Sequence, residues 1–179
     1  MKTQKKFQQE EVLYKETQQQ RQTWVFLLVV LLFLLSLVAV VQQNIMGVPF
    51  GNHPLPDTAL CFMPLIPAFL LAFLYMNRLE TVVTKKGVWL KYKPYHGKYR
   101  FYPWSEIENA YVRIYQPMKE YGGYGIRLLS GKSSGAYNVS GKTGLQLVFK
   151  NGRHLLIGTQ KGDELKSVIS QHVTEPHKN

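Results

Sequence analysis

The chain has 179 residues, of which 22 are lysine or arginine and 11 are aspartate or glutamate, so its formal net charge is +11. This length is enough for one domain with attachments, and the single cysteine excludes a framework of disulfide bonds. The mean hydropathy of −0.16 is typical of a soluble protein. That average hides an uneven distribution, because residues 22–56 and 58–77 contain no aspartate, glutamate, lysine or arginine.

Residues 1–22 are polar and rich in glutamine, and their basic residues are partly balanced by glutamates. The segment has little periodicity. We therefore expect a frayed helix that extends the apolar segment after it, attracted to anionic lipid by its basic residues and without a site of its own.

Two long apolar runs follow, WVFLLVVLLFLLSLVAVV and ALCFMPLIPAFLLAFLYM. A helix of this length is about 27 Å long, which with its polar flanks matches a hydrocarbon core of about 30 Å. We expect a two-helix transmembrane hairpin over residues 23–77, with spans at about 24–42 and 59–77.

Two other interpretations of these runs are less favoured. A buried helical hairpin in a soluble protein normally keeps a polar stripe, but the first run is apolar on every side except at Ser36. A cleaved signal peptide needs a shorter apolar region and a small-residue cleavage site, which VAVVQQN does not offer. Pro64 and Pro67 predict a bend in the second span, which membrane helices tolerate.

Basic residues lie before the first run and after the second, whereas the loop QQNIMGVPFGNHPLPD between them has no lysine or arginine. Lysine and arginine accumulate on the cytoplasmic side of a membrane. We therefore expect a multi-pass protein of the inner membrane with both termini in the cytoplasm, so that residues 1–22 and the chain after residue 77 are cytoplasmic.

Residues 78–179 alternate between polar and apolar side chains in the manner typical of strands. LETVVTKKGVWLKYK predicts two strands joined at Lys-Lys-Gly, with Val88, Leu90 and Tyr92 on one face. KYRFYPW and NAYVRIY predict two more. Short strands with glycine-rich turns indicate an antiparallel sheet that curls into a barrel or sandwich.

The stretch GLQLVFKNGRHLLIGTQ predicts a hairpin with Asn-Gly at its turn. A two-residue type I′ turn needs positive φ at both central residues, which Asn-Gly provides. In that register Phe149 pairs with His154 and Leu147 pairs with Leu156.

The last predicted element is a helix in KGDELKSVISQHV, where one face carries apolar residues at helical spacing. These residues, with one histidine, are Leu165, Val168, Ile169 and His172. The sequence thus predicts an all-β domain over residues 78–173, capped by a C-terminal helix, and a tail at residues 174–179.

Three stretches of this region carry a family resemblance: FYPWSEIENAYVR, YGGYGIR and SGKTGLQLVFKNGRHLLIGTQKGDEL. They resemble the bacterial pleckstrin-homology-like (PH-like) domains that follow a pair of membrane spans in small proteins of unknown function. The resemblance covers residues 78–173. It implies a PH-like fold in a bacterial membrane protein, and it implies a scaffold without catalytic chemistry.

No motif predicts an enzyme. Five residues lie between Gly135 and the Gly-Lys-Thr at residues 141–143, whereas a phosphate-binding loop has four at this place, and a predicted strand follows in place of the required helix. The histidines lack metal-ligand spacing, and no nucleophile motif occurs. We expect no catalytic residues, no cofactor and no metal site.

The remaining signal is charge, since residues 78–179 hold 17 lysines and arginines against 7 aspartates and glutamates. Membrane topology alone explains this excess as well as ligand binding does. We expect a membrane-anchored binding or scaffold module that engages anionic lipid headgroups, a peptide or a protein partner, and not nucleic acid. A structural or accessory subunit of a larger membrane complex is the alternative. The candidate binding residues are Arg113, Tyr121, Tyr124, Arg127, Lys132 and Lys142.

Overall fold

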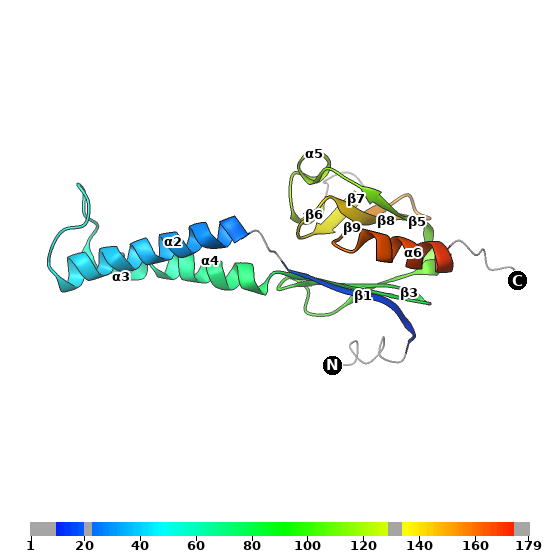
Figure 1. The fold of residues 1–179 in the computed structure, drawn as a ribbon, viewed down its shortest axis with the longest axis horizontal. Helices are drawn as coiled ribbons and strands as arrows, with labels where there is room; N and C mark the ends of the chain where they lie inside the picture. The colour runs from blue at the N-terminus through cyan, green and yellow to red at the C-terminus, as the bar shows by residue number, and fades with distance from the viewer. Residues whose placement is uncertain (1–9, 20–22, 129–133, 174–179) are drawn as a thin grey trace, which may run out of the picture. The chain divides into compact units, whose positions relative to one another are not determined.

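A computed structural model describes residues 10–19, 23–128 and 134–173 of the chain (Figure 1). The chain divides into two compact units. The hairpin is residues 21–76, and the β unit combines residues 1–20 with residues 77–179. Two long apolar helices are thus followed by two β-sheets and a C-terminal helix, as the sequence predicts at this level.

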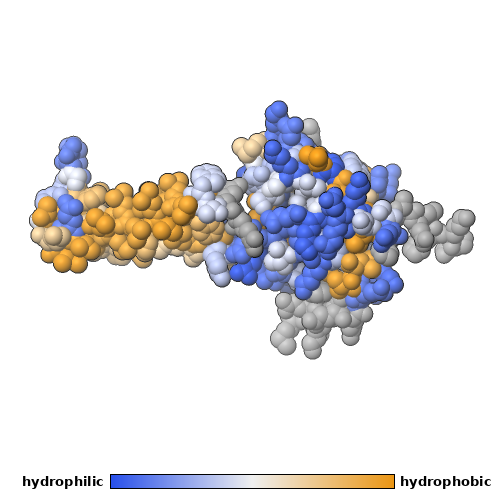
Figure 2. Space-filling model, in the orientation of Figure 1, coloured by the Kyte–Doolittle hydropathy of each residue, from blue (hydrophilic) through white to orange (hydrophobic). Residues whose placement is uncertain are grey.

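The hairpin consists of helices that are apolar over nearly their whole surface (Figure 2). Its elements are α2 (Thr23–Val40), a π-helical turn (Val41–Ile45), α3 (Asp57–Phe62) and α4 (Leu65–Met76). Among the described residues, two helical stretches are long and apolar enough to cross a membrane, Thr23–Ile45 and Asp57–Met76. The second is interrupted between Phe62 and Leu65, beside Pro64, in the region where the sequence predicts a bend.

Small side chains and amides hold the hairpin together. Ser36 and Ala39 of α2 are buried, which allows close packing. At the tip, Gln43 Nε2 donates to Asp57 Oδ1 at 2.7 Å, and Asn44 Nδ2 donates to Cys61 Sγ at 2.8 Å. These bonds tie the π-helical turn to α3.

The first sheet of the β unit has four antiparallel strands in chain order. They are β1 (Val12–Gln19), β2 (Arg78–Thr84), β3 (Gly87–Lys93) and β4 (Arg100–Pro103). The turn at Lys85-Lys86 is confirmed, since Thr84 pairs with Gly87. Val88, Leu90 and Tyr92 share the face that packs in the core, as the alternation predicts.

The expected frayed helix before the first span is wrong for residues 12–19, which form strand β1. This strand pairs with β2 from Val12 opposite Thr84 to Gln19 opposite Arg78. The hairpin is therefore an insertion between two neighbouring strands of one sheet. The sequence conceals the strand because two of its inward-facing residues, Glu16 and Gln18, are polar although they are buried.

The second sheet has five strands in the order β5-β8-β9-β7-β6. They are β5 (Ile107–Ile114), β6 (Gly125–Leu128), β7 (Ser134–Asn138), β8 (Thr143–Phe149) and β9 (His154–Thr159). Strand β7 lies parallel to β9, so the sheet is mixed and the antiparallel expectation is wrong for this pair. The two sheets pack face to face and do not close into a barrel.

The turn after β8 differs from the predicted one by one residue. Leu147 pairs with Leu155 and Val148 with His154. The Phe149 amide donates to the Arg153 carbonyl at 2.8 Å, and Gly152 takes φ 76°. The loop thus has three residues, with a glycine in the left-handed region at its end, and this adds one residue to the predicted connection.

The predicted terminal helix is confirmed as α6 (Gly162–Val173), which packs on β5 and β8. Leu165 and Ile169 join the core between the sheets. Two short helices complete the unit, a 3-10 turn (Trp104–Glu106) and α5 (Pro117–Tyr121).

Candidate ligand-binding site at helix α5

Helix α5 is a single short turn that follows β5. Pro117 begins it, which suits a first helical position where no amide bond is lost. Gly122 ends it at φ 69°, with its amide donating to the Met118 carbonyl at 3.1 Å. The Gln116 amide donates to Glu120 Oε1 at 2.8 Å, so a glutamate side chain provides the hydrogen-bond acceptor for the backbone amide just before the helix.

Arg113 of β5 holds α5 in place through hydrogen bonds of its guanidinium group. Its Nη2 donates to Glu120 Oε2 at 2.7 Å and to the Tyr121 hydroxyl at 3.2 Å, and its Nε donates to Gln146 Oε1 at 3.0 Å. The hydrogen bond with Glu120 raises the pKa of Arg113, and the same bond holds the pKa of Glu120 below its usual range. Both groups therefore stay charged near neutral pH.

Tyr121 is 9% exposed and packs edge-on against Tyr115, with ring centroids 6.0 Å apart. Ala136 and Leu156 complete this small second core on the outer face of the second sheet. Burial raises the pKa of Tyr121. Two of the predicted binding residues, Arg113 and Tyr121, are thus brought together, but their polar groups bond to the protein itself.

Tyr124 and Lys142 line a hollow of about 570 Å³ beside α5, which we call the α5 hollow. Its rim carries two strongly exposed apolar side chains, Ile114 at 77% and Met118 at 71%. Lys119 also lines it, so two lysines flank the apolar rim.

A buried asparagine positions the loop between α5 and β6. Asn138 Oδ1 accepts the Gly125 amide at 2.8 Å. Arg127 Nε donates to the Tyr124 carbonyl at 3.1 Å, and the Tyr124 hydroxyl donates to the Gly141 carbonyl at 3.3 Å. Tyr124 is thus fixed between Arg127 and the loop that carries Lys142. Lys132, also predicted to bind, lies outside the described residues.

The sequence predictions missed Ile114, Met118 and Lys119. A period-two pattern places Ile114 on the apolar face of β5, and nothing in the sequence shows that this face ends before residue 114. The sequence Gln-Pro-Met-Lys-Glu, with proline at a first helical position and a glutamate in the first turn, is compatible with a helix start, and this signal could have located α5.

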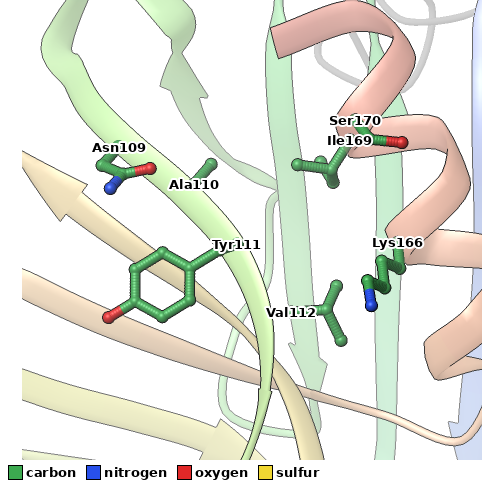
Figure 3. A pocket seen from close by; sticks show the side chains of 7 residues that line it. All are labelled: Asn109, Ala110, Tyr111, Val112, Lys166, Ile169 and Ser170. Atoms are coloured by element: carbon green, nitrogen blue, oxygen red, sulfur yellow. The ribbon is translucent and has the colours of Figure 1, made fainter. Parts of the chain in front are cut away.

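A second hollow, the β5–α6 groove, has a volume of about 240 Å³ and lies between strand β5 and helix α6 (Figure 3). Ala110 and Val112 extend from the strand toward the helix, and Ile169 and Lys166 extend from the helix toward the strand. Tyr111 lies on the opposite side of the strand (Figure 3). The sequence predicts the strand and the helix that carry these residues, but it does not assign any of them to a binding site.

Among the described residues, no group of three or more histidine, cysteine, aspartate or glutamate side chains could hold a metal ion. Both hollows offer hydrogen-bonding, charged and apolar groups, which suit binding. Comparison with protein-family models, with curated proteins and with solved structures finds no match to the chain.

Proposed function

We propose that the chain is a multi-pass protein of the bacterial cytoplasmic membrane, with the hairpin in the bilayer and both termini in the cytoplasm. Two observations support this. The hairpin exposes apolar side chains on nearly every side, which is stable in lipid and costly in water. The segment between its helices has no lysine or arginine, while the β unit is strongly basic.

The β unit is then a binding module of PH-like type. Two packed sheets and a terminal helix support that assignment, while the parallel pair in the second sheet departs from the antiparallel arrangement that the sequence predicts. Its hollows offer groups suited to binding, so the module recruits a ligand or partner and does not transform it.

The ligand that the geometry favours is the anionic headgroup layer of the membrane, bound at the α5 hollow. The observation that carries this proposal is the pair of exposed apolar side chains, Ile114 and Met118, beside Lys119 and Lys142. Apolar side chains enter the headgroup layer, and each lysine near an anionic surface adds about 1 kcal/mol of attraction. The bonds of Arg113 keep α5 in place, so little ordering is needed on binding.

A fluorescent probe on α5 tests this in the full-length protein. The probe is attached at Met118→Cys in a Cys61→Ser background, and the protein is reconstituted in phosphatidylcholine vesicles with and without phosphatidylglycerol. We expect a blue shift and quenching by headgroup-labelled lipid only when phosphatidylglycerol is present. Lys119→Gln with Lys142→Gln should remove the effect, because the two nearby charges are lost.

A probe at Asn151→Cys, in the exposed turn between β8 and β9, is the matched control and should remain in water. A probe at residue 118 that stays in water in both kinds of vesicle contradicts lipid binding at α5.

A structural or accessory subunit of a larger membrane complex is the second candidate. An apolar groove of about 260 Å³ runs between α2 and α4, lined by residues that include Leu32, Ser36 and Pro67. Side chains of a helix from another subunit would fit there. Crosslinking from Leu32→Cys in native membranes tests it, and a crosslinked protein species that disappears with Ser36→Leu would favour the subunit.

A further inference from the structure

Strand β5 leaves one row of backbone groups without a strand beside it. It is the outermost strand of its sheet, and within the described residues only β8 pairs with it. The Tyr115 amide donates to the Lys142 carbonyl at 2.8 Å, and the register continues with Arg113 opposite Gly144. Because antiparallel pairs alternate, the odd-numbered residues bond to β8. The amides and carbonyls of Ala110 and Val112 and the amide of Ile114 therefore point to the open edge, while the Ile114 carbonyl accepts a hydrogen bond from Arg113 Nη1 at 3.4 Å.

The open edge borders the β5–α6 groove. A strand added beside β5 would place every second side chain over α6, where Val112, Ile169 and Lys166 form the walls. The alternate side chains would pass over Tyr111, which is 42% exposed on the other side of the sheet. Backbone bonds and side-chain contacts would thus be made together.

We propose that β5 binds an extended segment of a partner protein as an added strand, with an acidic side chain of that segment facing Lys166. Lys166 is the charged residue of the groove lining, it is exposed, and its neighbours there are largely apolar. The favoured segment therefore alternates apolar residues and has an aspartate or glutamate among them. This site does not depend on lipid binding at α5.

The structure disfavours a second copy of the chain as the occupant. If the β5 strands of two copies paired, side chains of each β5 would have to enter the β5–α6 groove of the other copy. The candidates are Ala110 and Val112, and these already pack against the core and α6 of their own chain. Lipid is also disfavoured in this groove, because its acyl chains cannot bond to the open amides and carbonyls.

The test uses the full chain in phosphatidylcholine nanodiscs and a phage-displayed library of random decapeptides. We expect enrichment, relative to empty nanodiscs, of peptides with alternating apolar residues and at least one acidic residue. The best synthetic peptide should bind roughly tenfold more weakly to Lys166→Glu, because its acidic side chain then meets a like charge. Lys150→Glu, in the exposed turn after β8, is the matched control and should bind normally.

Two further measurements distinguish strand addition from other binding. Bound peptide should slow amide exchange at Ala110, Val112 and Ile114 by roughly tenfold or more, while Arg113 is already protected by β8. Val112→Pro removes an outward amide without breaking the bonds to β8, and it should weaken binding.

Three results would overturn the proposal. The first is that no peptide is enriched over empty nanodiscs. The second is peptides that bind Lys166→Glu as tightly as the unmodified chain and leave the three amides unprotected. The third is a dimer in sedimentation that Val112→Pro converts to a monomer, because a second copy would then be the occupant.

Discussion

At the scale of single residues, His96 shows how burial sets a charge state. The ring is 8% exposed, its Nδ1 accepts the Tyr92 amide at 3.2 Å, and its edge meets the Tyr137 ring with centroids 5.3 Å apart. Burial, followed by the nearby charge of Arg100, lowers the pKa of His96 below its usual value. The acceptor role of Nδ1 agrees with a neutral ring, since a protonated Nδ1 could not accept.

This histidine predicts a pH dependence of folding. The unfolded chain binds the proton more readily than the folded chain does. The contribution of His96 to the free energy of unfolding is therefore complete above a pH of about 6.5, and it decreases as the pH falls toward the pKa of the folded state. Urea unfolding of the reconstituted chain at pH about 7 and about 5.5 measures this. His96→Gln should reduce the difference between the two. If the His96→Gln variant loses as much stability between the two pH values as the unmodified chain does, other groups are responsible for the pH dependence.

Arg113 shows at the same scale why residue type alone does not locate a site. Its guanidinium bonds to Glu120, Tyr121 and Gln146, so it organises the α5 hollow without being open to a ligand. Lys142 has the same sign of charge, but it is exposed at the hollow itself.

At the scale of elements, β1 is connected to both sheets of the β unit. Glu16 of β1 accepts the Tyr14 hydroxyl at 2.6 Å, the Thr159 hydroxyl at 2.7 Å and the Gln160 amide at 2.9 Å. It is 6% exposed. One buried carboxylate therefore joins the N-terminal strand to the end of β9 in the other sheet, across 143 positions of sequence from Glu16 to Thr159.

A fragment of residues 77–179 should consequently fold poorly, because it lacks β1 and uncovers the edge of β2. A synthetic peptide of residues 10–19 should bind it and restore the native circular dichroism spectrum. With Glu16→Ala the peptide should bind more weakly by about 1–3 kcal/mol, since the buried hydroxyls of Tyr14 and Thr159 and the Gln160 amide lose their acceptor.

The matched control for that experiment is the same peptide with Glu11→Ala. Glu11 pairs with Lys85 at 2.6 Å, but its side chain is 63% exposed, so the change in affinity should be small. A fragment that folds to native stability without any peptide would contradict the role given to β1.

At the scale of the whole molecule, the hairpin is an insertion into a sheet that is complete without it. Gln19 and Arg78 are paired neighbours at the point where the chain leaves the β unit and returns to it. Replacement of residues 20–77 by Asn-Gly should therefore join β1 to β2 through an ordinary two-residue turn. The result should be a soluble, folded β unit.

Cooperative thermal unfolding and dispersed amide NMR signals would support this prediction. The same replacement with Glu16→Ala is the control, and it should unfold at a lower temperature because the buried Thr159 hydroxyl of β9 and the Gln160 amide after it lose their acceptor. If the joined protein is aggregated or unfolded although both strands are present, the hairpin contributes to the folding of the β unit.

The sequence by itself determined the elements whose signal is local. The apolar runs gave both long helical stretches, and Pro64, where a bend was predicted, lies between α3 and α4. Alternation gave β2 and β3 with their turn at Lys85-Lys86, and helical spacing gave α6. In each case, neighbouring residues fix both the conformation and the face that is buried.

Only the tertiary structure decided the features that depend on distant partners. Strand β1 could not be recognised because Glu16 is polar, and what makes its burial favourable lies at Thr159 and Gln160. The parallel pairing of β7 with β9 is also set by distant segments. The same holds for the occupied guanidinium of Arg113 and for the open edge of β5, because a side chain or backbone group is free or satisfied only with respect to the residues that folding brings beside it.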